Sequence, residues 1–164
     1  MKRASSVAWI LLLGTVTFAQ SASLTGTWKL DVKQSDFGSG PAPKSITSTV
    51  EDTPKMFSFR GRGIDDKGKS FSYSWRGPTD GNMYPTTENG KVTGKSSIRK
   101  VGDGFVRHGE GTDGSSFDAR ATVSSGGDTI TIEWTAKSKD GKETKWKSVF
   151  HRVAMQKSTG RKPA

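Results

Sequence analysis

The sequence predicts an all-β protein, an up-and-down antiparallel β-barrel of eight to ten strands. Two observations carry this prediction. Short runs in which apolar and polar residues alternate recur along the chain, and Gly-containing turn signals separate them. Alternation of this kind puts one face of a strand inside and the other in water. The turn signals are about 9–14 residues apart, which leaves no room for crossover helices, so consecutive strands must pair as antiparallel neighbours.

Each expected strand is defined by apolar residues at every second position. In chain order, the clearest candidates are 28–32, 46–50, 57–59, 71–75, 117–123, 130–136 and 146–150. Three weaker candidates fall between the fourth and fifth of these, at 83–86, 96–101 and 105–110. In the mature chain no segment keeps a 3.6-residue apolar period over three turns, so no helix is expected.

The connections carry the residue pairs that tight hairpins prefer. They are Asp66-Lys67-Gly68, Asp80-Gly81, Asn89-Gly90, Asp103-Gly104, Asp113-Gly114, Gly126-Gly127 and Asp140-Gly141. Gly, Asn and Asp tolerate the positive φ that two-residue hairpin turns require. These signals therefore support a meander of hairpins.

Closure of the sheet is expected because an open meander would leave two unpaired edges that invite aggregation. If the first and last strands pair antiparallel, Trp28 and Arg152 lie close together. A guanidinium group packed over the indole would seal that end of the barrel and contribute about 0.5–2 kcal/mol. The alternative of a membrane barrel is disfavoured, because the opposite strand faces carry charged residues such as Lys29, Asp118 and Arg120.

The first 22 residues are expected to be a secretory signal peptide. Lys2 and Arg3 precede an apolar run of 12 residues at 7–18, and small residues follow, with cleavage expected between 19 and 23. The run is shorter than the roughly 20 residues of a spanning helix. An uncleaved anchor is the alternative. The protein is therefore expected to be exported, to the periplasm or the extracellular space. The chain has no Cys, so no disulfide scaffold is available.

Positive charge is concentrated at the C-terminal end. Residues 23–136 hold 15 basic and 14 acidic side chains, whereas residues 137–164 hold 9 basic and 2 acidic ones. A nucleic-acid-binding domain usually spreads its positive charge over one face of its body, so no nucleic-acid partner is expected. Residues 154–164 are expected to be a basic flexible tail. The tail is either a solvated end or a weak contact with an anionic glycan or lipid surface.

Residues suited to catalysis or metal binding are sparse. Neither His108 nor His151 has a second His at a metal-ligand spacing, and no phosphate-binding loop or nucleophile elbow is present. His108 and Glu110 share a strand face, but this pair is more typical of an ordinary surface. Most of the Asp residues sit at turns, where they serve turn geometry, and Asp113 lacks the spacing of a calcium loop. No enzyme activity, metal or cofactor is expected.

Gly26-Thr27-Trp28, with Arg152 near the end of the last strand, resembles the Gly-x-Trp motif of lipocalins and their calycin relatives. More closely, 28–31, 35–37 and 40–45 resemble a pattern of small exported bacterial lipocalin-like proteins of uncharacterised function. The chain departs from lipocalins in having no Thr-Asp-Tyr second motif, no C-terminal helix pattern and no disulfide. The resemblance implies a lipocalin-like barrel over residues 23–153.

The segment from Lys33 to Lys44 is the longest one without a pattern, and its Gly and Pro residues exclude helix and strand. It follows the first strand, where lipocalins place a lid over the open mouth. Phe37 is the candidate residue to plug that mouth. The two interpretations are a ligand-gating lid and a covering loop whose Phe37 completes the core.

Three functions remain open. The first is an exported carrier of a small hydrophobic or fatty-acid-like ligand, held by inward side chains, with Tyr73 and Arg152 as polar anchors. The expected ligand-binding residues are Phe57, Phe59, Phe71, Tyr73, Trp75, Trp134, Trp146 and Arg152. The second is a solid-core barrel that acts as a structural or interaction module. The third is an uncharacterised enzyme. We expect a monomer.

Overall fold

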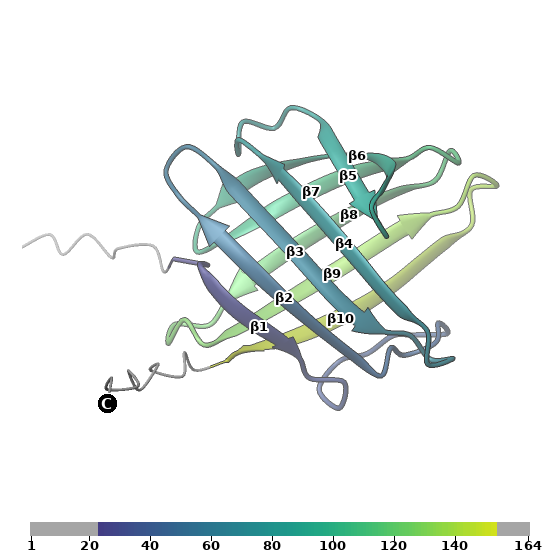
Figure 1. Cartoon of the computed structure of the whole chain (residues 1–164), viewed down its shortest axis with the longest axis horizontal. Helices are drawn as coiled ribbons and strands as arrows, with labels where there is room; N and C mark the ends of the chain where they lie inside the picture. Colours follow the sequence, from purple (N-terminus) through teal and green to yellow (C-terminus); the bar gives the residue numbers. More distant parts are fainter. Residues whose placement is uncertain (1–22, 154–164) are drawn as a thin grey trace, which may run out of the picture.

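Ten antiparallel strands follow one another around a closed barrel in the computed structural model, which describes residues 23–153 (Figure 1). Each strand pairs with its neighbours in sequence, and the last strand pairs with the first. The predicted up-and-down barrel is confirmed, and its ten strands are the upper limit of the expected eight to ten. The predicted signal peptide (1–22) and basic tail (154–164) lie outside the described residues. Within the described range, no helix has the length and apolar character needed to span a membrane.

Each of the ten candidate segments overlaps a strand, although the first strand already ends at Leu30, so Asp31 and Val32 of the 28–32 candidate lie outside it. They are β1 (Gly26–Leu30), β2 (Ser45–Asp52), β3 (Phe57–Ile64), β4 (Ser70–Gly77), β5 (Tyr84–Glu88), β6 (Lys91–Val101), β7 (Gly104–Gly111), β8 (Ser116–Val123), β9 (Thr129–Lys137) and β10 (Glu143–Arg152). The three weaker candidates correspond to β5, β6 and β7. A register shift between Thr86 and Thr87 interrupts the pairing of β5 with β6.

The barrel closes by pairing of the first strand with the last, as the sequence predicted. Trp28 of β1 is the register partner of Arg152 of β10, and the guanidinium carbon lies 4.3 Å from the indole centroid. The same guanidinium donates hydrogen bonds to the backbone carbonyls of Gly127 (2.8 Å), Ser23 (2.9 Å) and Thr25. Arg152 therefore ties the start of β1 and the β8–β9 turn to the last strand.

One turn lies one residue before its expected place. Gly102 has a φ of 56°, so the β6–β7 hairpin turns at Gly102-Asp103, and Gly104 is already in β7. Gly104 is buried in β7, where a Cβ would collide with the carbonyl oxygen of Ala121 on the neighbouring strand. Glycine is thus needed at position 104 because β7 and β8 approach each other closely there, and not because of a turn. At the β5–β6 hairpin, by contrast, Asn89 and Gly90 both have positive φ (49° and 76°), as the turn signal predicted.

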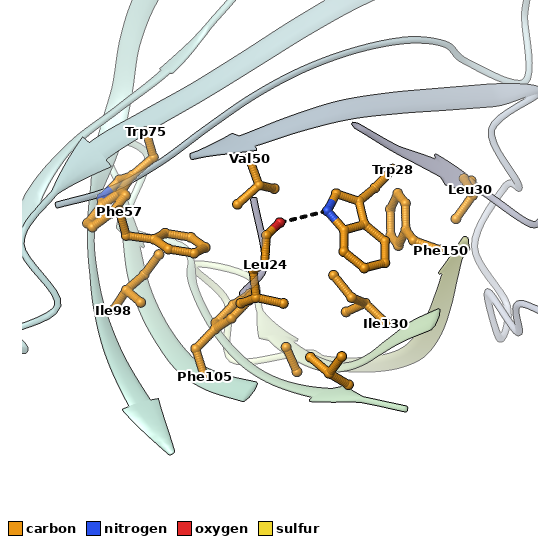
Figure 2. Close-up of a cluster of buried hydrophobic side chains, with 12 residues drawn as sticks. Leu24, Trp28, Leu30, Val50, Phe57, Trp75, Ile98, Phe105, Ile130 and Phe150 are labelled. Atoms are coloured by element: carbon orange, nitrogen blue, oxygen red, sulfur yellow. Dashed lines mark hydrogen bonds between the residues drawn. The ribbon is translucent and has the colours of Figure 1, made fainter. Parts of the chain in front are cut away.

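The hydrophobic core fills only one end of the barrel, here called the closed end. This is the end where β1 begins, where β10 stops and where the β6–β7 turn lies (Figure 1). Its buried side chains include Leu24, Trp28, Val50, Phe57, Trp75, Ile98, Phe105, Ile130 and Phe150 (Figure 2). Leu24, which precedes β1, lies among these side chains, and its carbonyl accepts a hydrogen bond from Trp28 Nε1 at 2.9 Å. The chain therefore plugs this end with its own N-terminal segment.

Candidate functional site

A cavity of about 880 Å³ extends from the closed-end core, several of whose side chains line it, to the end formed by the β1–β2 loop and the β3–β4, β5–β6, β7–β8 and β9–β10 turns. We call that end the mouth. The volume lies within the range of small-molecule sites, about 300–1,000 Å³. Aromatic side chains make up much of the wall. They are Phe37, Phe57, Phe59, Tyr73, Phe105, Phe117, Trp134, Trp146 and Phe150.

Cross-strand glycines explain how a barrel so rich in rings stays hollow. Gly61 of β3 is the register partner of Tyr73, and Gly109 of β7 is the partner of Phe117. A Cβ built on either glycine would fall inside its partner's ring. Each ring therefore lies against the wall, over the space that its glycine leaves, instead of crossing the barrel.

The floor of the cavity is polar. Five strands, β2 and β4 to β7, each carry an inward side chain with a hydroxyl or guanidinium group next to the core. These side chains are Ser48, Tyr73, Thr86, Ser96 and Arg107. Ser96 is fully buried, and its hydroxyl lies 3.0 Å from that of Thr86. A group of donors and acceptors thus interrupts the apolar lining of the cavity on this side of the barrel.

Arg107 is the cation in this floor. Its guanidinium carbon lies 4.8 Å from the ring centroids of both Phe59 and Phe117, so the group is held between two aromatic rings. Nε and Nη2 donate to Ser96 Oγ (3.1 and 3.0 Å), and Nη2 reaches Thr86 Oγ1 at 3.4 Å. Among the described residues, no carboxylate forms an ion pair with it.

Burial lowers the pKa of Arg107 to about 10, because desolvation penalises the charged form. The group therefore remains protonated at neutral pH. Burial also raises the pKa of the nearby Tyr73 phenol, although the Ser48 hydroxyl and the charge of Arg107 oppose that shift. Tyr73 is consequently a neutral hydroxyl at neutral pH. The floor offers one positive charge together with uncharged polar groups.

Two tryptophans form the wall nearer the mouth. Trp134 of β9 and Trp146 of β10 are register partners, and their rings stack with centroids 5.4 Å apart and planes 4° apart. Trp134 also contacts Phe117, whose centroid lies 5.8 Å away. The Trp134 Nε1 atom is buried and has no hydrogen-bond partner within the described chain. This part of the wall is a flat, rigid aromatic surface.

The β1–β2 loop lies at the mouth and is fixed to the last strand. The backbone of Asp36 pairs with that of Lys147 in both directions, with N···O distances of 2.9 and 2.7 Å. The hydroxyl of Ser35 accepts a hydrogen bond from the amide of Val149 at 2.9 Å. Phe37 then lines the cavity and packs against the buried cluster. The structure thus places Phe37 where either interpretation of the loop requires it.

The structure brings five of the eight expected ligand-binding residues to the cavity. They are Phe57, Phe59, Tyr73, Trp134 and Trp146. Three others lie elsewhere: Phe71, Trp75 and Arg152 are absent from its lining. Trp75 is 2% exposed in the closed-end core, where its Nε1 donates to the carbonyl of Ser96 (2.9 Å). Arg152 is engaged over Trp28 at the closed end, so it is not available as the polar anchor of this cavity. Phe71 lies over Gly63, its partner on β3.

Arg107 and Phe117 are the residues that sequence reasoning missed. The signal was present, because Arg107 shares its parity with the inward Phe105, two residues before it. An arginine on the inward face of a barrel strand is unusual, since buried charge is costly. The 105–110 run was a weaker strand candidate, and this hid the significance of its inward charge.

A second hollow, of about 510 Å³, lies on the outer surface over β6–β9, and His108 is part of its lining, whereas Glu110 is not. His108 Nδ1 lies 2.8 Å from Asp118 Oδ1, whereas its Nε2 is 3.9 Å from Glu110. The side chains of His108 and Asp118 are 46% and 73% exposed. In the described part of the chain, no cluster of three potential metal ligands is found. The arrangement is that of a solvated, hydrogen-bonded pair on the surface.

A scan against models of known protein families and a search of curated proteins find no match for this chain. The fold itself, a closed ten-stranded antiparallel barrel, is consistent with a lipocalin-like barrel.

Proposed function

We propose that this protein is an exported carrier or sensor that holds one small apolar or amphiphilic molecule inside its barrel. The observation that carries the proposal is the cavity of about 880 Å³ with aromatic walls and a polar floor. Ligand sites combine these features, because apolar walls supply affinity and a few polar groups fix orientation. The predicted signal peptide places the carrier in the periplasm or outside the cell.

The hollow supports a carrier over a solid-core barrel. Protein interiors are normally packed as densely as organic crystals, and unfilled volume costs stability. Here the closed end is packed in the ordinary way, while the mouth half is left open by glycines opposite Tyr73 and Phe117. A barrel with only a structural role would have no use for such an arrangement.

No observation specifically favours either of the two alternative functions, an interaction module or an enzyme. Four large hydrophobic residues of the described chain are exposed: Ile64, Val92, Val101 and Val153. They lie at or near the ends of strands. An interaction module would be expected to show a continuous apolar patch. The acidic residues of the cavity lining, Glu88, Glu110 and Asp113, are all exposed, whereas an enzyme site typically holds a buried acid or base.

The test is a titration of the folded protein with the neutral fluorescent probe N-phenyl-1-naphthylamine. We expect one site per chain and quenching of tryptophan emission, because Trp134 and Trp146 line the cavity. Phe59→Trp should weaken binding by adding volume inside the barrel, whereas Ser72→Trp adds the same ring on the exposed face and should not. Folded protein that binds no probe at high micromolar concentration would instead support the solid core.

A further inference from the structure

We infer that the ligand is a monoanionic amphiphile, such as a long-chain carboxylic acid, that enters head first and pairs its anionic group with Arg107 at the floor of the cavity. This inference rests on the proposed carrier function and adds the chemical class and orientation of the ligand.

The first step is the uncompensated charge of Arg107. A buried cation is expensive unless an anion and hydrogen bonds satisfy it. Within the described chain, hydroxyl groups are its hydrogen-bond partners, and aromatic faces cover both sides of the guanidinium plane. Across residues 23–153, the charge of Arg107 has no ion-pair partner. It is therefore suited to an anion that arrives from outside.

The second step is the edge of the guanidinium that remains open. Ser96 Oγ occupies the edge formed by Nε and Nη2, at 3.1 and 3.0 Å. Nη2 also donates to Thr86 Oγ1, at 3.4 Å, whereas no hydrogen bond from Nη1 to the described residues is found, so Nη1 is the nitrogen left for a carboxylate. By displacing the long Thr86 contact, a carboxylate would accept a second, parallel bond from Nη2. Because Phe59 and Phe117 hold the plane, the group needs little reorganisation on binding.

The third step is orientation. Below Arg107, one inward position along β7, lies Phe105, which is buried in the closed-end core and is the last inward residue of the cavity lining on this strand. Toward the mouth, the wall continues with Phe117, Trp134 and Trp146. We therefore expect an apolar body attached to a carboxylate at Arg107 to run along this aromatic wall toward the mouth.

The fourth step is the charge of the head group. The other cation of the lining is Lys95, which is exposed and forms an ion pair with Glu110 at 3.1 Å. One buried positive charge matches a single negative charge, as in a carboxylate or sulfonate. A dianionic phosphate would leave one negative charge without a partner at the floor.

The experiment compares dodecanoic acid with dodecanol as competitors for N-phenyl-1-naphthylamine at pH 7.5. We expect the acid to bind roughly 10- to 100-fold more tightly, the gain expected of charge-assisted hydrogen bonds. Arg107→Gln should remove this preference and leave the affinity of the alcohol nearly unchanged. Arg120→Gln is the matched control, because it removes the same charge from the exposed face of β8. Equal binding of acid and alcohol by the native protein, or equal loss of both in Arg107→Gln, would overturn the inference.

Orientation is tested with 12-bromododecanoic acid, whose bromine quenches nearby tryptophans. Head-first binding places the bromine toward the mouth, so quenching should fall in Trp146→Phe and persist in Trp75→Phe. The reverse pattern would refute the orientation. The two proposals fail separately: loss of probe binding refutes the carrier, whereas retained probe binding without acid preference refutes only the anionic head group.

Discussion

Replacing Gly109 with alanine should close part of the cavity and destabilise the barrel at the same time. The new Cβ would lie well inside 3.0 Å of the Phe117 ring, a separation that real Cβ atoms essentially never show. Phe117 is the cross-strand partner of Gly109, so the strands cannot separate without breaking their ladder. The ring must therefore swing away from the wall, and the open direction is the cavity.

The magnitude follows from what this movement costs and gains. Overpacking of a well-ordered site costs about 1–3 kcal/mol. Movement of Phe117 also weakens its contact with the Arg107 guanidinium, 4.8 Å from the ring, which is worth about 0.5–2 kcal/mol. Alanine recovers about 0.5–1 kcal/mol because it restricts the unfolded chain more than glycine does. We expect the free energy of unfolding to fall by about 1–3 kcal/mol.

Urea unfolding followed by circular dichroism gives this free energy, and the naphthylamine titration gives the loss of probe affinity in the same samples. Gly126→Ala is the control, because a Cβ there would come no closer than 3.7 Å to a neighbouring side chain and the glycine lies in an exposed turn. A double variant, Gly109→Ala with Phe117→Leu, should recover part of the stability by removing the clash. If Gly109→Ala matches Gly126→Ala in both stability and probe affinity, the explanation of the hollow by glycine–aromatic pairs is wrong.

Three further predictions concern closure, access and acid stability. Trp28→Ala should lower the free energy of unfolding by about 3–5 kcal/mol, and a double-mutant cycle with Arg152→Gln should show coupling; additive losses would contradict their contact. Phe37→Ala should speed probe release in stopped-flow measurements, and unchanged rates would argue against a gate. Hydrogen bonds from Ser115 lower the pKa of Asp113 below its ordinary 3.8. The ionised carboxylate therefore contributes to the free energy of unfolding above pH 3.8, and this contribution is lost as the pH falls through the lower pKa of the folded state. Asp113→Asn should therefore reduce the dependence of the free energy of unfolding on pH in the acid range, measured by urea unfolding at several pH values.

Stability and binding are divided along the axis of this barrel. The closed end contains the packed core, the Leu24 plug and the Trp28–Arg152 contact. The mouth half contains the polar floor and the open volume. Some core side chains, such as Phe57 and Phe105, also line the cavity, whereas Trp134 and Trp146 line it outside the buried core cluster, so ligand contacts at the two tryptophans can be altered without changing the core.

The sequence by itself determined the order of the strands, their antiparallel pairing and the closure of the sheet. Alternation at every second residue specifies which side chains point inward, and turn signals specify where strands reverse. The pairing of Trp28 with Arg152 followed from these two patterns together with closure. The placement of Phe37 near the mouth followed from the resemblance to lipocalins.

Only the tertiary structure decided how deep each inward side chain lies. Alternation gives the face of a strand but not the height along the barrel axis, which depends on the stagger between strands. Trp75 and Trp134 share the inward face, yet one is packed in the core and the other lines the cavity. Arg152 seals the closed end, while Arg107 lies at the floor of the cavity. The cross-strand register also decided which glycine faces which ring, and therefore that the barrel is hollow.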